Sequence, residues 1–325
     1  MKSSRRILLV KPSSLGDVVH ALPVVAAIRE HWPECELRWL ILPAWRSLVE
    51  ENPGVSATIL FPRDRFRGPS GWLRAAAWGG TLRDWRPDLA LDLQGLLRSG
   101  LFCRLSGAPR IIGLSDAREG AGLLHTDRVS VDSRDHAVRR CLRVLEPLGI
   151  PVPSEPRFDL PDGGLPAGFD PSEPYLVLHP FARGRGKSLD GSMIRAFLRG
   201  AAGRRVILVG RGDCPHDLPR HAENWTNRTD LGELIGMIRR ASFIVSSDSG
   251  PMHLAAALRP ERTLSIHFWS DPLRVGPFPG CSRIWKNGRL TQVSGLDDSW
   301  RPEGRPPTEM EMEELGHLAV GEISK

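Results

Sequence analysis

Residues Ile7-Leu-Leu-Val-Lys-Pro-Ser-Ser-Leu-Gly-Asp-Val-Val-His20 decide the fold of this chain. The four apolar residues at 7–10 predict a buried strand, and the polar, glycine-containing turn that follows leads into a helix. In an open α/β sheet, ligands bind beyond the carboxyl ends of the strands, so this turn is a candidate site. Two interpretations stay open: Asp17 takes part in chemistry, or Ser14 or Asp17 simply caps the helix.

The chain has 325 residues, which is enough for two domains of ordinary size. Its content of 41% hydrophobic and 25% charged residues is typical of a soluble globular protein. No stretch reaches the roughly 18 uninterrupted apolar residues of a spanning helix, and the N-terminus lacks the apolar core of a signal peptide. We therefore expect a cytoplasmic location.

The chain is basic, with a formal net charge of +6 and a sequence pI near 9.4. This charge predicts an anionic partner, and the ten tryptophans also suit partial contact with lipid headgroups. The basic residues form no recognisable nucleic-acid-binding motif, so we expect no nucleic acid among the partners. The five cysteines are scattered without a C-x-x-C pair, which predicts neither a zinc site nor a disulfide framework. No metal site and no cofactor are expected.

Apolar runs alternate with helical patterns in both halves of the chain. Strands are predicted at 7–10, 37–42, 57–61, 89–93, 175–179, 206–209, 243–246 and 262–266. Helices are predicted at 22–31, with Pro23 in the first turn, and at 192–199, 231–240 and 251–258. A segment rich in proline and glycine at 146–174 predicts a linker. The pattern favours two tandem α/β domains with parallel sheets and a cleft between their edges.

Two segments in the second half of the chain suit phosphate binding. Residues Ser246-Ser-Asp-Ser-Gly-Pro-Met-His253 join a strand to a helix, and the backbone N–H groups at a helix start form a ready phosphate site. Residues His179-Pro-Phe-Ala-Arg-Gly-Arg-Gly-Lys187 place Arg183, Arg185 and Lys187 on a flexible loop that suits a pyrophosphate. A helix cap and a solvated basic loop are the respective alternatives.

Six segments, taken in their order along the chain, resemble the motifs of a known protein family. They are residues 11–23, Leu91-Asp-Leu-Gln-Gly-Leu-Leu-Arg-Ser99, Ala117-Arg-Glu119, residues 179–187, Asp248-Ser-Gly-Pro-Met-His-Leu254 and Ser270-Asp-Pro272. Together they resemble the motifs of glycosyltransferase family 9, and the first half is most similar to the lipopolysaccharide heptosyltransferase I subfamily. The likeness covers about residues 6–280.

The resemblance implies a GT-B fold, in which two Rossmann-like domains have parallel sheets that face a central cleft. An acceptor-binding domain would occupy 1–160 and a domain that binds the nucleotide-sugar donor would occupy 161–325, with the last helix a candidate for packing back on the first domain. The implied enzyme is inverting and metal-independent. It moves a heptose from ADP-heptose to the inner-core Kdo sugar of a lipid A precursor in lipopolysaccharide biosynthesis, at the cytoplasmic face of the inner membrane. The implied partners are this nucleotide sugar, an anionic glycolipid acceptor and, peripherally, the membrane.

The resemblance also implies roles for individual residues. Asp17 is the catalytic base, because inversion needs one carboxylate to take the acceptor proton while the leaving group departs on the opposite face. The donor-binding positions are Arg183, Lys187, Asp248, Ser249, Gly250 and His253. The acceptor-binding positions are Ser13, Ser14, Gln94, Arg98 and Arg118. A cluster formed by Arg63, Arg65, Arg67, Arg74, Arg83 and Arg86 either holds the acidic groups of the acceptor or is a solvated basic surface.

Three departures from the family pattern fall in the donor half. Phe181 stands where a small or hydroxylated residue is usual, and Ser188-Leu-Asp190 replaces an aromatic-proline end of the same loop. Phe268-Trp269 precede Ser270 where Gly-Pro is usual. These changes leave the reaction type in place and leave the donor sugar open.

Three alternatives to this function remain. A nucleotide-dependent dehydrogenase is disfavoured because the first turn lacks the G-x-G-x-x-G spacing. A non-catalytic relative that binds a nucleotide sugar or a glycolipid is disfavoured because Asp17 and Lys187 are both present. A family 9 transferase with another sugar donor is the third.

Overall fold

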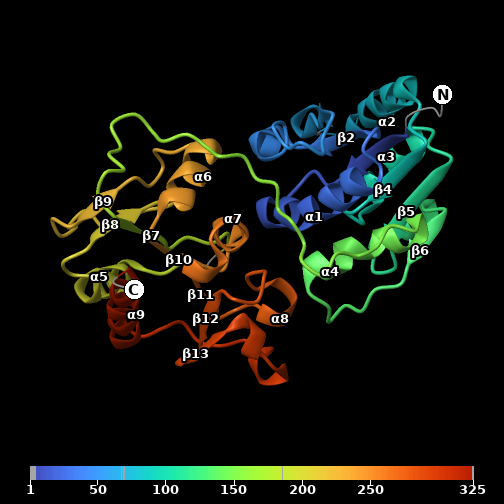
Figure 1. Ribbon diagram of the computed structural model, residues 1–325. Coiled ribbons are helices and arrows are strands. Elements are labelled where there is room, and N and C mark those ends of the chain that lie inside the picture. The colour runs from blue at the N-terminus through green and yellow to red at the C-terminus, as the bar shows by residue number, and fades with distance from the viewer. Residues whose placement is uncertain (1–4, 67, 69, 185, 324–325) are drawn as a thin grey trace. The chain divides into compact units, whose positions relative to one another are not determined.

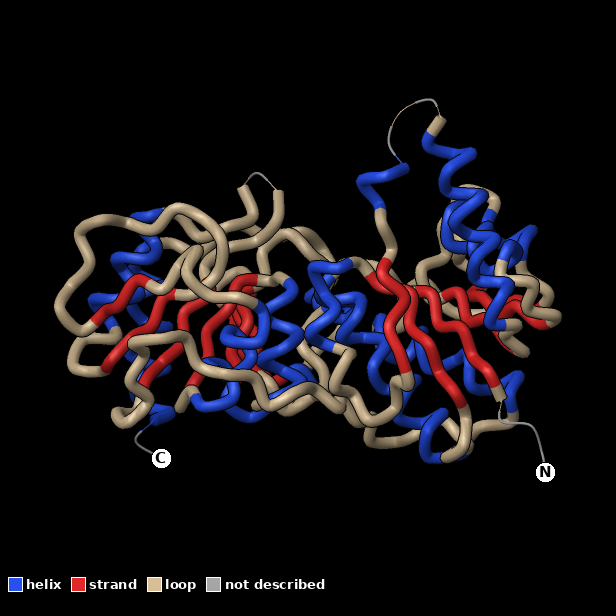
Figure 2. The backbone as a smooth tube through the Cα atoms, turned by 90° about the horizontal axis from the view of Figure 1, so that it is seen from above, coloured by secondary structure: helices blue, strands red, loops and turns tan. Residues whose placement is uncertain are grey.

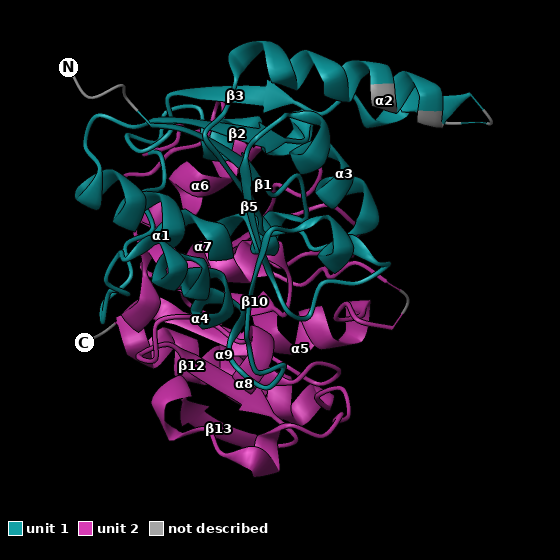
Figure 3. Ribbon diagram, turned by 90° about the vertical axis from the view of Figure 1, so that its right-hand side faces the viewer, with its two compact units in different colours: residues 1–161 teal, residues 162–325 magenta. Residues whose placement is uncertain are grey.

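The computed structural model describes residues 5–66, 68, 70–184 and 186–323 (Figure 1). Strands and the helices that flank them make up most of the regular structure (Figure 2). The chain forms two compact units, residues 1–161 and residues 162–325 (Figure 3). In the part of the chain that the structure describes, no helix combines the length and the apolar character needed to cross a membrane.

The N-terminal unit contains a six-stranded sheet in the order β3-β2-β1-β4-β5-β6, and all of its strand pairs are parallel. Its strands are β1 (Arg6–Val10), β2 (Glu36–Ile41), β3 (Ala57–Leu60), β4 (Leu89–Asp92), β5 (Arg110–Leu114) and β6 (Asp127–Val129). The apolar run at 7–10 is fully buried, as expected for a parallel strand covered on both faces. The strand order reverses between β1 and β4, which is the position where α/β sheets of this kind bind ligands.

Helices cover both faces of this sheet. They are α1 (Leu15–His31), α2 (Gly71–Thr81), α3 (Leu97–Leu105) and α4 (Ala137–Leu142). Helices α1 and α4 pack together on one face, and α2 and α3 on the other (Figures 1 and 3). The sequence prediction for α1 was wrong in its start: the helix begins at Leu15, and Pro23 lies in its interior. Ser14 and Asp17 supply the start signal, which outweighs the preference of proline for a first turn.

The C-terminal unit contains a seven-stranded sheet in the order β13-β12-β11-β10-β7-β8-β9. Its strands are β7 (Tyr175–His179), β8 (Arg205–Leu208), β9 (Ala222–Asn224), β10 (Phe243–Ser247), β11 (Thr263–Ile266), β12 (Arg283–Lys286) and β13 (Arg289–Gln292). The strands pair in parallel except for β12 with β13, which are antiparallel. The two units thus confirm the predicted pair of Rossmann-like α/β domains.

The helices of this unit are α5 (Gly191–Gly200), α6 (Leu231–Arg240), α7 (Gly250–Leu258), α8 (Pro272–Val275) and α9 (Glu309–Ile323). The last helix, α9, packs along α5 within the C-terminal unit. A side chain at Gly200 would overlap the backbone of Glu313, so the two helices come unusually close there. Arg199 of α5 pairs with Glu309 and Glu313 of α9 at 3.3 and 3.1 Å. The contact is therefore both apolar and ionic.

The segment at 149–174 contains no helix or strand, which confirms most of the predicted linker. A 3₁₀ helix at Arg143–Leu148 occupies its predicted beginning. The prolines of this segment fix φ and remove backbone donors, which prevents regular hydrogen bonding. The division between the two compact units falls within this segment, after Pro161.

Candidate active site

Asp17 lies in the first turn of α1, where its carboxylate takes part in the helix cap. The backbone N–H and the hydroxyl of Ser14 both donate to Oδ2 of Asp17, at 2.9 and 2.7 Å. Asp17 therefore contributes to the cap of α1. Capping does not bury the carboxylate, because 46% of the Asp17 side chain is exposed and Oδ1 lies 3.6 Å from the Lys11 ammonium. The hydrogen bonds to Oδ2 fix the side chain of Asp17, and the carboxylate stays accessible to solvent.

Lys11 is a buried lysine that the sequence analysis did not single out. Its ammonium donates to the carbonyl of Leu93 at 2.8 Å, and its side chain is 9% exposed. The indole N–H of Trp39 donates to the Lys11 carbonyl at 3.1 Å. Lys11 therefore links the end of β1 to the end of β4 and sets a positive charge beside Asp17.

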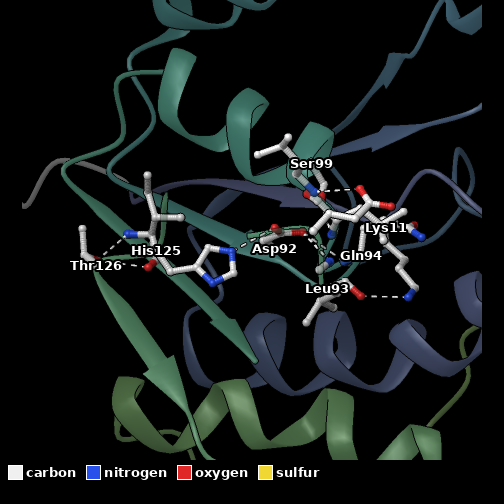
Figure 4. A network of polar contacts seen from close by, with 12 residues as sticks. Lys11, Asp92, Leu93, Gln94, Ser99, His125 and Thr126 are labelled. Carbon is white, nitrogen blue, oxygen red and sulfur yellow. Dashed lines mark hydrogen bonds and ion pairs between the residues drawn. The ribbon is translucent and has the colours of Figure 1, made fainter. Parts of the chain in front are cut away.

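A buried carboxylate at the end of β4 organises the neighbouring turn (Figure 4). Oδ2 of Asp92 lies 3.0 Å from Nε2 of His125, and neither side chain has any exposed surface. Oδ1 of Asp92 accepts hydrogen bonds from the backbone N–H groups of Gln94 and Gly95 at 3.1 and 3.0 Å. Gly95 has φ of +65°, a backbone conformation that favours glycine. The pair of Asp92 and His125 thus holds the turn that carries Gln94.

The predicted acceptor positions gather at this same edge of the sheet. The backbone N–H of Arg118 donates to the carbonyl of Gly95 at 2.8 Å, which joins the segments around Gln94 and Arg118. Arg118 is exposed, whereas Gln94, Arg98 and Ser13 are half-buried. The amide oxygen of Gln94 is buried and has no hydrogen-bond partner among the described residues. Because β4 pairs with β1, these loops and Asp17 share one carboxyl edge.

The predicted arginine cluster separates into two groups. Arg63 and Arg65 follow the carboxyl end of β3, and the guanidinium of Arg74 donates to the carbonyl of Arg65 at 2.8 Å. Arg83 and Arg86 come after α2 has returned along the sheet, so they lie at the amino ends of the strands. Arg67 lies outside the described residues. Only the first group can act at the edge that carries Asp17.

The C-terminal sheet also gathers polar groups at its carboxyl edge. His179 ends β7, and the hydroxyl oxygens of Ser246 and Ser249 lie 3.4 and 3.3 Å from its Nδ1. Burial lowers the pKa of His179 to about 4, so the ring is neutral near pH 7. A neutral imidazole lets the turn after β10 pack against the loop after β7 without a buried charge.

His179 therefore makes the fold sensitive to acid. Its pKa is about 4 in the folded chain against an ordinary 6.5, so the unfolded chain binds more protons between these values. Stability should fall as pH drops below 6.5, and the loss from this group is complete near pH 4, on the order of 3 kcal/mol. Urea unfolding at pH 7.5 and 5 would measure it. His179→Leu should show a smaller difference between the two pH values, and an unchanged difference would contradict the assignment.

The loop after β7 is closed by residues that depart from the family pattern. Ser188 accepts from the backbone N–H of Ala182 at 2.9 Å, and Leu189 is buried. Asp190 caps α5 by accepting from two backbone N–H groups of the first turn. Phe181 is buried against Gly212, where a Cβ would overlap its ring. The departures are therefore structural substitutes that preserve a closed loop.

This loop presents Lys187 on an aromatic ring. The ammonium of Lys187 lies 3.6 Å from the ring centroid of Trp269, a contact within the range of a cation–π interaction. Arg183 is exposed on the same loop, and Arg185 lies outside the described residues. The sequence marks Trp269 only as a departure from the family pattern, and its contact with Lys187 across 82 positions could not be predicted.

A buried polar network supports the turn after β10. Asp248 is 4% exposed, and its Oδ2 lies 3.5 Å from Nδ1 of His267. The same nitrogen lies 2.9 Å from the hydroxyl of Ser270, and the ammonium of Lys286 donates to the Ser270 carbonyl at 2.6 Å. Burial lowers the pKa of both His267 and Lys286. Lys286 and His267 are functional candidates that the sequence analysis missed.

The remaining predicted donor residues lie at the start of α7. Ser249 is the N-cap residue, and the helix begins at Gly250 with Pro251 as its second residue. The first backbone N–H groups of a helix have no partners within it, and the helix dipole makes this end favourable to anions. His253 is buried one turn into α7. Asp248, Ser249, Gly250 and His253 therefore lie close together, from the end of β10 into the first turn of α7.

The fold, together with the polar groups at the carboxyl ends of the strands, defines a class of protein. It is an α/β protein of two Rossmann-like units, the GT-B architecture, with polar loops and a helix start at the carboxyl ends of the strands. More specifically, the chain belongs to glycosyltransferase family 9 (heptosyltransferase), whose family model matches residues 76–289. The protein is therefore a glycosyltransferase.

Relatives whose names state a function support this family assignment. The chain is 30% identical to lipopolysaccharide heptosyltransferase 1 of Salmonella typhimurium, over 84% of this chain and 91% of the relative. It is 23% identical to the lipopolysaccharide core heptosyltransferase OpsX of Haemophilus influenzae, over 95% of this chain and 90% of the relative. The solved structure of E. coli heptosyltransferase WaaC with ADP is 23% identical and superposes with a TM-score of 0.72, over 86% of this chain and 92% of that chain.

Proposed function

We propose that this protein transfers a heptose from ADP-heptose to the inner-core Kdo sugar of a lipid A precursor, with inversion at the anomeric carbon. The accessible Asp17 carboxylate at the switch point of the N-terminal sheet is the observation that carries this proposal. The family membership and the names of the relatives support the choice of heptose as the sugar and of lipopolysaccharide as the acceptor class.

Asp17 acts as the general base in this proposal. It takes the proton of the acceptor hydroxyl as the acceptor oxygen bonds to the anomeric carbon of the heptose, and ADP departs from the opposite face. The two contacts from Ser14 to Oδ2 hold the carboxylate in one orientation. A fixed base needs no reorganisation during the reaction, which favours proton transfer. Ser13 and Ser14 shape the acceptor side.

The C-terminal unit binds the donor in this proposal. Lys187 contacts the diphosphate, and the start of α7 adds the backbone N–H groups near Gly250. Together they neutralise the charge that develops on the departing diphosphate, in the role that a metal ion has in other transferases. Arg183, Asp248, Ser249 and His253 complete the donor site. Because the base and the donor site lie in different units, the reaction requires the base and the bound donor to be brought together.

The acceptor is an anionic glycolipid in this proposal, so the protein works at the cytoplasmic face of the inner membrane. Gln94, Arg98 and Arg118 lie at the edge of the sheet that carries Asp17, where they would contact the acceptor. Arg63 and Arg65 extend this edge with exposed guanidinium groups. Guanidinium groups recognise phosphates and carboxylates through paired hydrogen bonds.

Charge reversal tests the acceptor assignment. Arg63→Glu with Arg65→Glu should raise the KM for the lipid acceptor about tenfold or more, because each arginine contributes a charged hydrogen bond. The KM for ADP-heptose should stay unchanged. The matched control is Arg220→Glu with Arg228→Glu, which makes the same charge change at exposed positions of the C-terminal unit. Equal effects of the two pairs would mean that the total charge, and not this edge, governs acceptor binding.

The transfer itself is tested with purified protein, ADP-heptose and a Kdo-bearing lipid A precursor. We expect a heptosylated lipid and stoichiometric ADP, and a panel of other nucleotide sugars should give slower transfer. Thermal stabilisation by ADP-heptose without any product would instead identify a non-catalytic binding protein. Faster transfer from another nucleotide sugar would contradict the assignment of heptose.

A further inference from the structure

A hollow at the amino-end edge of the N-terminal sheet is lined by three arginines. Arg6 begins β1, Asp88 immediately precedes β4, and Arg83 and Arg86 lie between α2 and β4. The hollow has a volume of about 410 Å³. It lies at the opposite end of the strands from Lys11 and Asp17, so it is separate from the proposed reaction site.

The charges in this hollow are not balanced. Oδ2 of Asp88 accepts from the backbone N–H of Arg6 at 2.8 Å and lies 3.9 Å from its Nε, so these two residues compensate each other. A second nitrogen of Arg6 donates to the carbonyl of Trp85 at 2.8 Å. The exposed side chains of Arg83 and Arg86 form no hydrogen bond or ion pair within the part of the chain that the structure describes. Two guanidinium groups are therefore left without an anion.

The side chain of Arg83 lies close to the backbone at Gly107. A Cβ at Gly107 would be 3.3 Å from both Cγ and Nε of Arg83, so the glycine lets the Arg83 side chain lie close over the chain there. Two guanidinium groups three positions apart offer paired donors that match the oxygens of a phosphate. The volume exceeds that of one phosphate ion, which leaves room for an attached organic group.

We propose that Arg83 and Arg86, with Arg6, form a binding site for a phosphate group that is separate from the reaction site. The ligand is a phosphorylated small molecule or the headgroup of an anionic phospholipid, because both present the same phosphate oxygens. Binding depends on charge and weakens as salt is added.

Two binding measurements test this site. In a Lys187→Met background, which removes the proposed donor contact, equilibrium dialysis with glycerol 3-phosphate reports a free phosphate compound. Sedimentation with phosphatidylglycerol vesicles, against phosphatidylcholine vesicles, reports a lipid headgroup. Adding Arg83→Ala with Arg86→Ala should weaken binding of glycerol 3-phosphate, of the phosphatidylglycerol vesicles, or of both by tenfold or more. The measurement that responds shows whether the ligand is a free phosphate compound or a lipid headgroup. Arg220→Ala with Arg228→Ala serves as the control pair. An unchanged affinity in both arms, or an equal loss in the control pair, would overturn the proposal.

A separate observation concerns Trp269, and its interpretation rests on the proposed function. Trp269 follows β11, whereas Lys187 follows β7, and both strands pair with β10. The ammonium of Lys187 lies 3.6 Å from the centre of the Trp269 ring. The stem of Lys187 also lies close over Gly184, where a Cβ would be 3.3 Å from its Cδ. The lysine is thus held between a glycine and an aromatic face.

We infer that Trp269 is a positioning residue that holds the Lys187 ammonium ready for the diphosphate of the donor. A free lysine has many rotamers, and restricting them before binding lowers the entropic cost of the contact. The ring face attracts the ammonium without neutralising it, so its full charge remains for the phosphate.

A double-mutant cycle on ADP affinity tests this inference. Trp269→Leu should weaken ADP binding about 2- to 30-fold, the range of a cation–π contact, and Trp269→Phe should recover part of the loss. In a Lys187→Met background the same Trp269→Leu change should have little further effect. An equal loss in both backgrounds, or none in the first, would overturn the inference. If the unaltered protein binds no ADP, the proposed function fails instead.

Discussion

Asp17→Asn is expected to abolish most heptose transfer while the affinity for ADP-heptose stays unchanged. Loss of a general base slows a reaction by about 10²- to 10⁴-fold, and the amide cannot take the acceptor proton. Asparagine is chosen because its amide oxygen can still accept the hydrogen bonds that Ser14 donates to Oδ2. Single-turnover transfer rates and a separate donor-binding titration would measure the two quantities.

The control for this variant separates capping from chemistry. Ser14→Ala removes the hydroxyl contact to Asp17 and leaves the carboxylate in place. It should lower the free energy of unfolding by about 1 kcal/mol, as a lost helix cap does. It should slow transfer much less than Asp17→Asn does, because the carboxylate remains and the backbone N–H of Ser14 still donates to it. If Ser14→Ala and Asp17→Asn lose transfer equally, Asp17 acts through the structure of the turn and is not the base.

Lys187→Met should weaken the binding of both ADP-heptose and ADP about 10- to 100-fold, because a charged contact to the diphosphate is lost. Methionine keeps a long apolar side chain that can still lie on the Trp269 ring, so the loop should remain closed. Isothermal titration with ADP measures the effect directly. Arg228→Met removes one positive charge from an exposed position of the same unit and should leave the affinity unchanged. Unchanged ADP binding by Lys187→Met would remove this lysine from the donor site.

Much of the fold could be predicted because buried parallel strands leave a simple sequence pattern. The apolar runs at 7–10, 89–93 and 175–179 are strands in the structure, with ends that differ by at most one residue. Five further strands, β5, β6, β9, β12 and β13, were not predicted. Of these, β13 lies at an edge of the sheet and its residues are mostly exposed. The predicted start of α1 is seven residues too late, because proline is typical of a first turn whereas here the helix begins after the cap at Ser14.

The candidate site was predictable only where its residues lie close in sequence. Asp17 follows β1 within seven residues, and the turn from Asp248 to His253 is continuous, so both stood out in the sequence. The contacts that hold the neighbouring loops come from far along the chain. His125 meets Asp92 across 33 positions, and Lys286 reaches Ser270 across 16. Such contacts depend on strand order, which sequence periodicity does not encode.

The two halves of the arginine cluster show the same limit. Arg63 and Arg83 are 20 positions apart, yet the intervening helix α2 carries the chain from one edge of the sheet to the other. Charge counted along the sequence therefore joined two surfaces that the fold separates. The first group lies at the edge that carries Asp17, and the second group lies at the opposite end of the strands.

The most direct test of the central claim is a crystal structure of the protein with ADP-heptose, or a non-transferable analogue, and the lipid acceptor. The account predicts that an Asp17 carboxylate oxygen lies within about 3.2 Å of the acceptor hydroxyl while the Lys187 ammonium contacts the diphosphate of the same donor. A ternary complex in which the acceptor hydroxyl faces another group, with Asp17 engaged only by Ser14 and Lys11, would contradict it.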